Sequence, residues 1–176
     1  MLETETRERF EQAVLPHLDA AYNLARWLTR NEQDAQDVTQ EAFLRAFRFF
    51  DGCQGGSERA WLLTIVRNTC YTWIQRNRRA GRTELFDEEI HSIEFSGDAD
   101  PETQVLARAK EESLRRALEE LPDVFREVLV LREMEGMSYK EIADVTCVSL
   151  GTVMSRLARA RTQLRESLSV SLGKEP

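Results

Sequence analysis

The sequence predicts an all-α protein in which two small helical domains are joined by a flexible acidic linker, the second domain containing a helix-turn-helix. Long stretches carry apolar residues at helical spacing, and few strand signals occur anywhere. Residues 83–104 hold eight acidic and no basic side chains, a composition typical of a linker without a core of its own. With 176 residues, of which 41% are hydrophobic, the chain is long enough for one or two packed domains.

The first domain is expected over residues 1–82. Its three predicted helices cover about residues 6–29 with a bend at Pro16, 34–49 with Asp34 as the N-cap, and 59–79. The residues expected to face the core are Leu15, Leu18, Tyr22, Ala25 and Leu28 in the first helix, Ala35, Val38, Ala42 and Phe43 in the second, and Trp61, Leu62, Ile65, Val66, Thr69 and Trp73 in the third. Residues 51–58 hold three glycines and are predicted to form a loop.

The second domain is expected over residues 105–176, after the acidic linker at 83–104. Its first helix is predicted from about Thr103 to Glu120, and the next follows Pro122, which suits a first helical turn, and stops near Gly136. The apolar residues of that second helix that should be buried are Phe125, Val128, Leu129 and Leu131.

A helix-turn-helix is predicted to close this domain. Ser138 and Glu141 fit a capping box, with Ile142, Ala143 and Val145 as the buried face that follows. Ser149 and Gly151 mark the start of a last helix. Its core-facing residues are Val153, Leu157, Ala160, Leu164 and Leu168, and its opposite face carries Thr152, Ser155, Arg156, Arg159 and Gln163. Because Arg forks onto guanine and hydroxyls bond phosphates or base edges, this face suits a DNA major groove; the alternative is a solvated amphipathic helix.

The net charge of −7 is unevenly distributed, and the linker accounts for all of the acidity. Residues 59–82 hold six arginines and no acid, and residues 147–165 hold four arginines and no acid. Local basic patches decide where phosphate binds, so the acidic balance of the whole chain does not exclude a nucleic-acid partner.

The third helix mixes cations, aromatic rings and amides in a way that suits unpaired nucleic acid. Cations track phosphates, and rings stack on bases that have left the duplex. The residues that carry this pattern are Arg67, Asn68, Tyr71, Thr72, Trp73, Arg76, Arg78 and Arg79. Alternatively, Trp61 and Trp73 belong to the core and the last arginines only favour the helix C-terminus. The second helix presents Asp34, Asp37, Gln40 and Glu41, which form either a solvated face or a contact for a basic partner.

Several classes of protein are disfavoured by the sequence. It has no run of about 18 apolar residues for a membrane span and no secretory signal, so we expect a cytoplasmic protein. Cys53, Cys70 and Cys147 are scattered and, with His17 and His91, match no zinc spacing, so neither a metal nor a cofactor is expected. No credible nucleophile is evident, so an enzyme is not expected.

Three ordered blocks of this chain resemble bacterial RNA polymerase sigma factors of the extracytoplasmic-function (ECF) group. The first block is Asp34–Arg45. The second runs from Arg59 through Arg67-Asn68-Thr69 to Arg79. The third combines Leu121-Pro122, Arg126–Leu129, Leu131–Glu133, Gly136–Ala143 and Gly151–Arg161. The resemblance spans about residues 6–168. It implies a region-two-like domain at 1–82, and a region-four-like domain at 105–176.

The resemblance implies a sigma factor that binds core RNA polymerase and directs promoter-specific initiation under the control of an anti-sigma factor. It implies contacts with the β′ clamp helices through Asp37, Gln40, Glu41 and Arg45, and further contact with the β subunit. The residues implied to read and open the minus-ten element of promoter DNA are Gln54, Gly55, Arg67, Asn68, Trp73, Arg76, Arg78 and Arg79. Those implied to face the minus-thirty-five element are Ser149, Thr152, Ser155, Arg156 and Arg159.

The chain departs from the family pattern in three places. Gln36 stands where an acid is common, and the loop around Cys53 to Gly56 lacks a common basic-glycine-acid pattern. In the turn of the helix-turn-helix, Cys147 stands where glycine is commoner, although cysteine adopts a positive φ at greater cost than glycine.

Three other functions remain to be weighed. A stand-alone helix-turn-helix transcriptional regulator would have no need of the Asp34–Arg45 block. A nucleic-acid hydrolase lacks its nucleophile. A protein that only sequesters a partner would have no use for Arg156 and Arg159 on one exposed face.

Overall fold

The computed structural model describes residues 2–53, 56–81 and 100–173, and these form helices without any strand. The first group of helices comprises α1 (Leu2–Val14), the 3-10 turn η1 (Leu15–His17), α2 (Leu18–Thr29), α3 (Glu32–Arg48), the 3-10 turn η2 (Phe50–Gly52) and α4 (Glu58–Arg79). The second comprises α5 (Pro101–Glu120), α6 (Asp123–Leu129), the π-helical turn η3 (Val130–Met134), α7 (Tyr139–Thr146) and α8 (Leu150–Leu172). The all-α prediction is confirmed.

The predicted bend at Pro16 is a full break, and it changes which residues are buried. Pro16 lies within η1, which separates α1 from α2 and rotates the apolar face between them. Val14 and Leu24 are fully buried, whereas Leu15 and Leu18 are 49% and 43% exposed. The expectation that Leu15 and Leu18 face the core is therefore wrong, because it assumes one continuous helix, whereas η1 interrupts the helical period between α1 and α2. Of the same predicted stripe, Ala25 and Leu28 are buried and Tyr22 is half-buried.

The start of α3 also differs from the prediction. Asn31, not Asp34, is the N-cap, and its side-chain oxygen accepts a hydrogen bond from the Asp34 amide at 2.9 Å. Asp34 lies in the first turn instead, where a negative charge is favoured by the helix dipole. The helix buries Ala35, Val38 and Ala42 as expected, and it packs against α2 and α4.

The predicted helix-turn-helix is present as α7 and α8. In the capping box, Ser138 Oγ accepts from the Glu141 amide at 3.2 Å, and the Glu141 carboxylate accepts from the Ser138 amide at 2.8 Å. Val153, Leu157 and Ala160 are buried, as predicted, while Leu164 and Leu168 are only half-buried. Cys147 ends α7 with φ of 55°, so the turn takes the left-handed conformation that glycine would adopt at lower cost.

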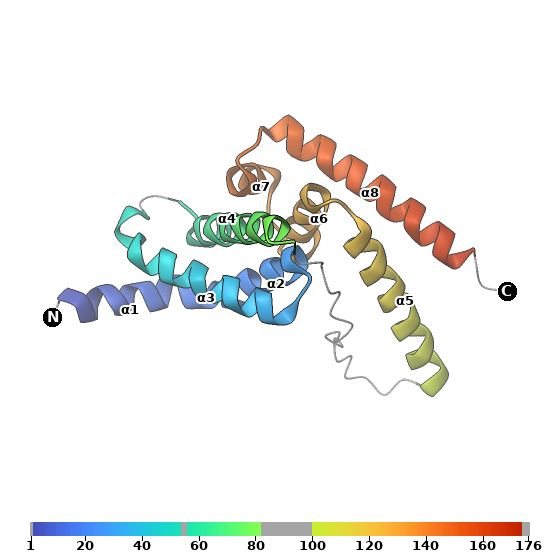
Figure 1. Ribbon diagram of the computed structural model, residues 1–176, viewed down its shortest axis with the longest axis horizontal. Coiled ribbons are helices and arrows are strands. Elements are labelled where there is room, and N and C mark those ends of the chain that lie inside the picture. Colours follow the sequence, from blue (N-terminus) through green and yellow to red (C-terminus); the bar gives the residue numbers. More distant parts are fainter. Residues whose placement is uncertain (1, 54–55, 82–99, 174–176) are drawn as a thin grey trace.

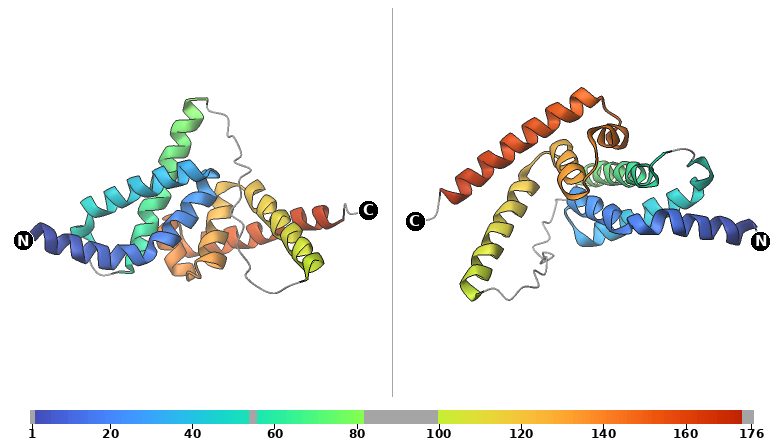
Figure 2. Two further views of the ribbon diagram at one scale, coloured as in Figure 1. Left: turned by 90° about the horizontal axis from the view of Figure 1, so that it is seen from below. Right: turned by 180° about the vertical axis from the view of Figure 1, so that it is seen from behind.

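The two groups of helices lie against each other. α4 packs on α7 and α2 packs on α6, and Figure 1 shows α6 and α7 between α4 and α8. The buried apolar residues of both groups form one continuous cluster. The reverse view in Figure 2 shows α5 and α8 diverging away from this junction. The linker expected at 83–104 falls mostly outside the described residues, and its last four residues already belong to α5, which begins at Pro101 instead of about Thr103.

Candidate nucleic-acid and protein interfaces

A buried carboxylate, Glu127 on α6, lies where the two groups of helices meet. It accepts two hydrogen bonds from the Arg67 guanidinium of α4, at 2.8 Å from Nε and 3.2 Å from Nη2. Arg156 of α8 approaches from the other side, with its Nη1 3.6 Å from Glu127 Oε1. The Glu127 side chain is 0% exposed and that of Arg67 only 16%. Burial raises the pKa of the Glu127 carboxyl, and the Arg67 hydrogen bonds and charge oppose that shift.

Tyr71, one turn after Arg67 on α4, completes this cluster. The Arg67 guanidinium lies 4.5 Å from the centroid of its ring, a cation–π distance. Burial, and secondarily the charge of Glu127, raises the pKa of the Tyr71 phenol above its usual value. Tyr71 was part of the sequence pattern for stacking on an unpaired base, but here it packs against the core cluster beside the ion pair.

A second charged cluster surrounds the start of α6. Arg126 is fully buried and donates to the carbonyl oxygens of Leu118, Glu119 and Leu121 within its own group, and to that of Trp27 across the junction at 3.0 Å. Asp123 is approached by three arginines: Arg126 and Arg78 at 3.3 Å and Arg30 at 3.8 Å. Two of these arginines, Arg30 and Arg78, come from the first group of helices. Charged side chains therefore join the groups at two separate places.

The π-helical turn η3 makes a third contact between the groups. The Glu135 side chain accepts from Asn23 Nδ2 of α2 at 2.7 Å, and the Glu135 carbonyl accepts from Arg59 Nη1 of α4 at 3.0 Å. The wider turn, in which the Glu135 amide donates to the Val130 carbonyl, presents this residue toward α2 and α4.

The residues predicted to read the minus-thirty-five element all lie on the first three turns of α8 or at its cap. Ser149 caps the helix by accepting from the Thr152 amide at 3.2 Å, and its hydroxyl lies 2.9 Å from Thr152 Oγ1. Ser155 and Arg159 are exposed, as predicted. Arg156 differs: its side chain is 23% exposed and turned toward Glu127. The expectation that Arg156 stands on an open face is wrong for this arrangement, because a buried carboxylate attracts it.

The residues predicted for the minus-ten element have three different environments along α4. Asn68, Arg76 and Arg79 are exposed. Arg67 and Arg78 are paired with acids of the second group, Glu127 and Asp123. Trp73 is half-buried and packs against the core, which favours the alternative that it supports the fold. Gln54 and Gly55 lie outside the described residues.

The residues predicted to contact polymerase form one accessible face of α3. Asp37, Gln40 and Glu41 are exposed, and Arg45 is half-buried. Glu41 pairs with Arg45 one turn later, and Asp37 accepts from Gln33 at 3.3 Å. Among the described residues, none of the hydrogen bonds and ion pairs of these four side chains reaches the second group.

Three features of these surfaces were missed by the sequence reasoning. Leu44 and Phe47 on α3 are 64% and 45% exposed beside Arg45, an apolar addition to the polymerase face. Met154 on α8 is 52% exposed between Ser155 and the cap. The third feature is the burial of the neighbours Arg126 and Glu127. Two charges inside the apolar run Val124–Leu131 are a signal for a buried polar cluster, which the sequence analysis does not use.

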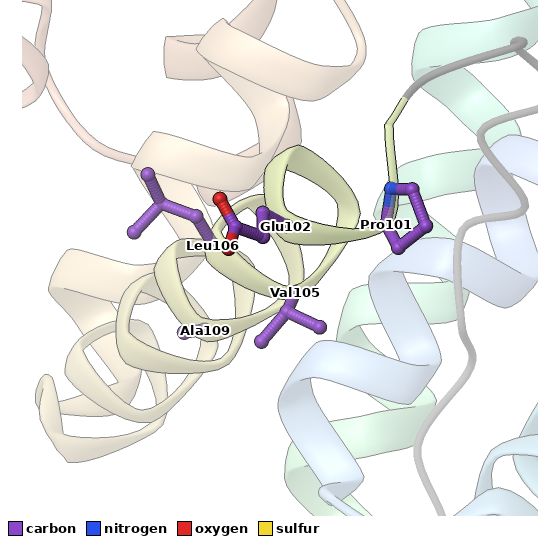
Figure 3. A pocket seen from close by; sticks show the side chains of 5 residues that line it. All are labelled: Pro101, Glu102, Val105, Leu106 and Ala109. Carbon is purple, nitrogen blue, oxygen red and sulfur yellow. The ribbon is translucent and has the colours of Figure 1, made fainter.

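A shallow, open hollow along the first turns of α5 is lined by Pro101, Glu102, Val105, Leu106 and Ala109 (Figure 3). Within the described residues, no cluster of three or more histidine, cysteine or acidic side chains could hold a metal ion. None of the helices described combines the length and hydropathy that crossing a bilayer requires. Burial raises the pKa of the Cys70 thiol to about 12.

This combination of an exposed helix-turn-helix face, an arginine-rich helix and an accessible acidic helix defines a helical DNA-binding protein with a protein-docking face. Residues 13–80 match the family model for sigma-70 region 2, and residues 111–164 match that for sigma-70 region 4. The chain belongs to the ECF-type RNA polymerase sigma factors.

Curated relatives agree with this assignment. The chain is 38% identical to the ECF RNA polymerase sigma factor SigE of Mycolicibacterium smegmatis over 91% of its own length, and spans 62% of that relative. It is 33% identical to the RNA polymerase sigma-H factor of Pseudomonas aeruginosa, covering 92% of this chain and 87% of the relative. It is 35% identical to the ECF sigma-E factor of Escherichia coli K12, over 73% and 70% of the two chains.

Two solved structures are similar across both groups of helices. The sigma factor RpoE in complex with the anti-sigma factor NepR, from Bartonella quintana, superposes with a TM-score of 0.76 at 28% identity, covering 93% of this chain and 98% of that chain. CnrH in complex with the cytosolic domain of CnrY gives a TM-score of 0.64 at 30% identity, with 93% and 90% covered.

Proposed function

We propose that this protein binds core RNA polymerase and directs initiation at a specific set of promoters, without catalytic chemistry of its own. The observation that carries the proposal is the match of regions 2 and 4 to residues 13–80 and 111–164, in the family order. The stand-alone regulator is not favoured, because such a protein would have no need of a region 2. The proposed division is a region-two-like domain at 1–82, a linker at 83–104 and a region-four-like domain at 105–176.

The polymerase contact is assigned to the exposed face of α3. Asp37, Gln40, Glu41 and Arg45 supply charges and amides for the β′ clamp helices, and the exposed Leu44 and Phe47 add apolar area beside them. The β subunit is the proposed second contact in the polymerase. An interface with an apolar centre and a polar rim is typical of specific protein association, and a few anchor residues carry most of its free energy.

Promoter DNA is assigned to α4 and α8. Arg159, Ser155 and Thr152 would enter the upstream major groove, with Ser149 at the helix cap. Asn68, Arg76 and Arg79 are exposed on α4 for the minus-ten element, where Arg67 and Arg78 would join them once the second domain moves away. Each contact alone is weak, and docking both domains on one polymerase raises the effective concentration of the second contact.

An anti-sigma factor is the proposed inhibitory partner, since one similar structure holds the sigma factor RpoE bound to the anti-sigma factor NepR, and the other holds CnrH bound to a second protein. The cytoplasm, where polymerase and promoters are found, is the proposed location.

Run-off transcription with purified core polymerase across genomic fragments tests the central proposal. We expect defined start sites that depend on the added protein and that share two upstream elements. Absence of specific initiation by the inhibitor-free protein with its cognate polymerase would overturn it.

A further inference from the structure

Met154 adds an apolar side chain to the part of α8 that is proposed to enter the upstream major groove. It lies between Ser155 and the start of the helix and is 52% exposed. Within the described residues, it is not one of those that pack in or against the core cluster. Single exposed apolar residues are common on protein surfaces, so exposure alone assigns no role to this one. Its position beside the proposed base-reading residues does.

The first turn of α8 leaves room for the Met154 side chain. Long side chains of helical residues run back toward the helix N-terminus and cover the preceding turn. Gly151, three positions earlier, has no side chain, and a Cβ at that position would meet no other atom within 4 Å. In helix-turn-helix proteins, the N-terminal residues of the recognition helix contact the base edges. Met154 and the open surface over Gly151 therefore lie at the end of α8 that would approach the bases.

The chemistry of a methionine restricts what it can recognise in DNA. A thioether donates no hydrogen bond and accepts one only weakly, so it offers little to a phosphate or to a polar base edge. Against a polar edge it would displace water without replacing the lost hydrogen bonds, at a cost in free energy. The apolar group that distinguishes one base pair from another in the major groove is the 5-methyl group of thymine. That methyl group is the feature that Met154 fits.

Ser155, the next residue, offers a polar contact to the same kind of base pair. Its hydroxyl donates to the Thr152 carbonyl at 3.1 Å, which leaves the lone pairs of its oxygen as acceptors. In the major groove such an acceptor suits the amino group of adenine or that of cytosine. It does not distinguish between these two bases by itself. The amino group and a methyl group occur together only on the edge of an A·T pair, so Met154 supplies the discrimination that Ser155 lacks.

We propose that Met154 contacts the 5-methyl group of a thymine in the upstream promoter element and thereby selects an A·T pair at one position. The inference rests on the proposed function and deepens it, because it names one chemical feature of the DNA that this protein reads. Burying one methyl-sized group against an apolar surface changes an equilibrium constant about fourfold. The contact therefore tunes promoter choice, while Arg159 and the hydroxyl groups contribute the polar contacts.

The test removes that methyl group from the DNA without changing the base pairing. Run-off transcription first maps the promoters, and each thymine of the upstream element, on either strand, is then replaced singly by deoxyuridine. Competition binding by the holoenzyme, formed from core polymerase and the full-length chain, measures the effect of each replacement. The variants are Met154→Ala, which shortens the side chain, and Met154→Leu, which keeps an apolar one. The matched control is Val170→Ala, because Val170 is also exposed on α8 but lies roughly 24 Å further along its axis.

With the wild-type chain, we expect deoxyuridine to weaken binding about threefold to fivefold at one or two of the thymines and to have no effect at the others. Met154→Ala should bind the thymine promoter as weakly as wild type binds the deoxyuridine promoter, and the replacement should cause no further loss. Met154→Leu and Val170→Ala should keep the wild-type response. Met154 is exposed, so its truncation should leave the fold intact, which circular dichroism checks.

Three results would overturn the proposal. The first is a wild-type holoenzyme that responds to deoxyuridine at none of the thymines. The second is a Met154→Ala holoenzyme that responds as strongly as wild type does. The third is a Met154→Ala holoenzyme that is weakened equally on thymine and on deoxyuridine promoters relative to wild type, which would assign Met154 to a different contact.

Failure of the proposed function gives a different result. Absence of initiation by the wild-type chain with core polymerase refutes the function and the role of Met154 with it. Normal initiation without any dependence on the thymine methyl group refutes only the role of Met154.

Discussion

Arg67 and Glu127 are 60 positions apart in the sequence, yet they form a two-point ion pair that joins α4 to α6. The contact is largely shielded from water, because the Glu127 side chain is fully buried. Low local polarity strengthens the attraction between such charges and also penalises the loss of either partner. The pair therefore matters for stability as well as for the exposure of Arg67.

A double-mutant cycle should detect the free energy of this pair. We expect Arg67→Met and Glu127→Gln to show a coupling of about 1–3 kcal/mol in urea unfolding, as residues in one buried network do. The comparison is Glu133→Gln with Arg161→Met, an exposed pair for which about 0–1 kcal/mol is expected. Equal coupling in both cycles would show that burial does not strengthen the Arg67–Glu127 contact.

The apolar part of the α3 face should carry much of the polymerase affinity. Leu44→Ala is expected to weaken binding to core polymerase by about tenfold, since truncating one of the few residues that anchor an interface costs more than about 1 kcal/mol. Gln40→Ala combined with Glu41→Ala should also weaken assembly. Fluorescence anisotropy with labelled protein measures both effects. Leu15→Ala, which truncates an exposed leucine of η1 and not of α3, serves as the control and should bind as wild type does.

Arg159 and Arg156 should behave differently although both lie on α8. Arg159 is exposed, so Arg159→Ala is expected to cost about 1–3 kcal/mol at one base of the upstream element and to leave stability unchanged. Arg156→Ala removes a neighbour of the buried Glu127 and should lower the unfolding free energy as well as DNA affinity. Transcription from promoters with single-base changes, with urea unfolding in parallel, separates the two effects. Arg165→Ala is the matched control on the exposed side of a later turn.

If Arg159→Ala and wild type discriminate equally between bases at every upstream position, Arg159 does not belong to the recognition surface. An unfolding free energy unaffected by Arg156→Ala would show that Glu127 does not need this second arginine.

The capping box at α7 should make stability depend on acid pH. The hydrogen bond from the Ser138 amide holds the pKa of the Glu141 carboxyl below its usual value. A carboxyl with a lowered folded-state pKa contributes stability that is present above its unfolded-state pKa and is lost as pH falls through the folded-state value. Urea unfolding of wild type and Glu141→Gln should therefore differ most near neutral pH and converge in acid. A constant difference across that range would exclude ionised Glu141 as the source.

Local signals in the sequence predicted much of this fold. The Ser138–Glu141 pattern and the proline in η1 act within one or two helical turns, so each could be read without knowledge of the rest of the chain. The error at Leu15 and Leu18 arose because the 3-10 turn changes the helical phase, and the extent of such a change is not encoded in apolar spacing.

The arrangement of the candidate sites could not be predicted in the same way. The position of Arg156 along α8 predicts an open face. Its environment instead depends on Glu127, which lies on another helix and 29 positions earlier in the sequence. The exposure of Arg67 depends on the packing between the two groups of helices, which no local sequence pattern predicts. The roles of these residues in binding DNA and polymerase stay predictions, to be decided by the experiments above.

The π-helical turn η3 restricts how this chain can vary in length. Its wide turn accommodates one more residue than an α-helical turn would, and that residue sets the direction in which Glu135 and the following Gly136 leave the helix. Deleting a single residue from Val130–Met134 would replace the wide turn with a regular α-helical turn and change the direction in which the chain enters α7. Related chains should therefore tolerate substitution in this turn far more readily than insertion or deletion.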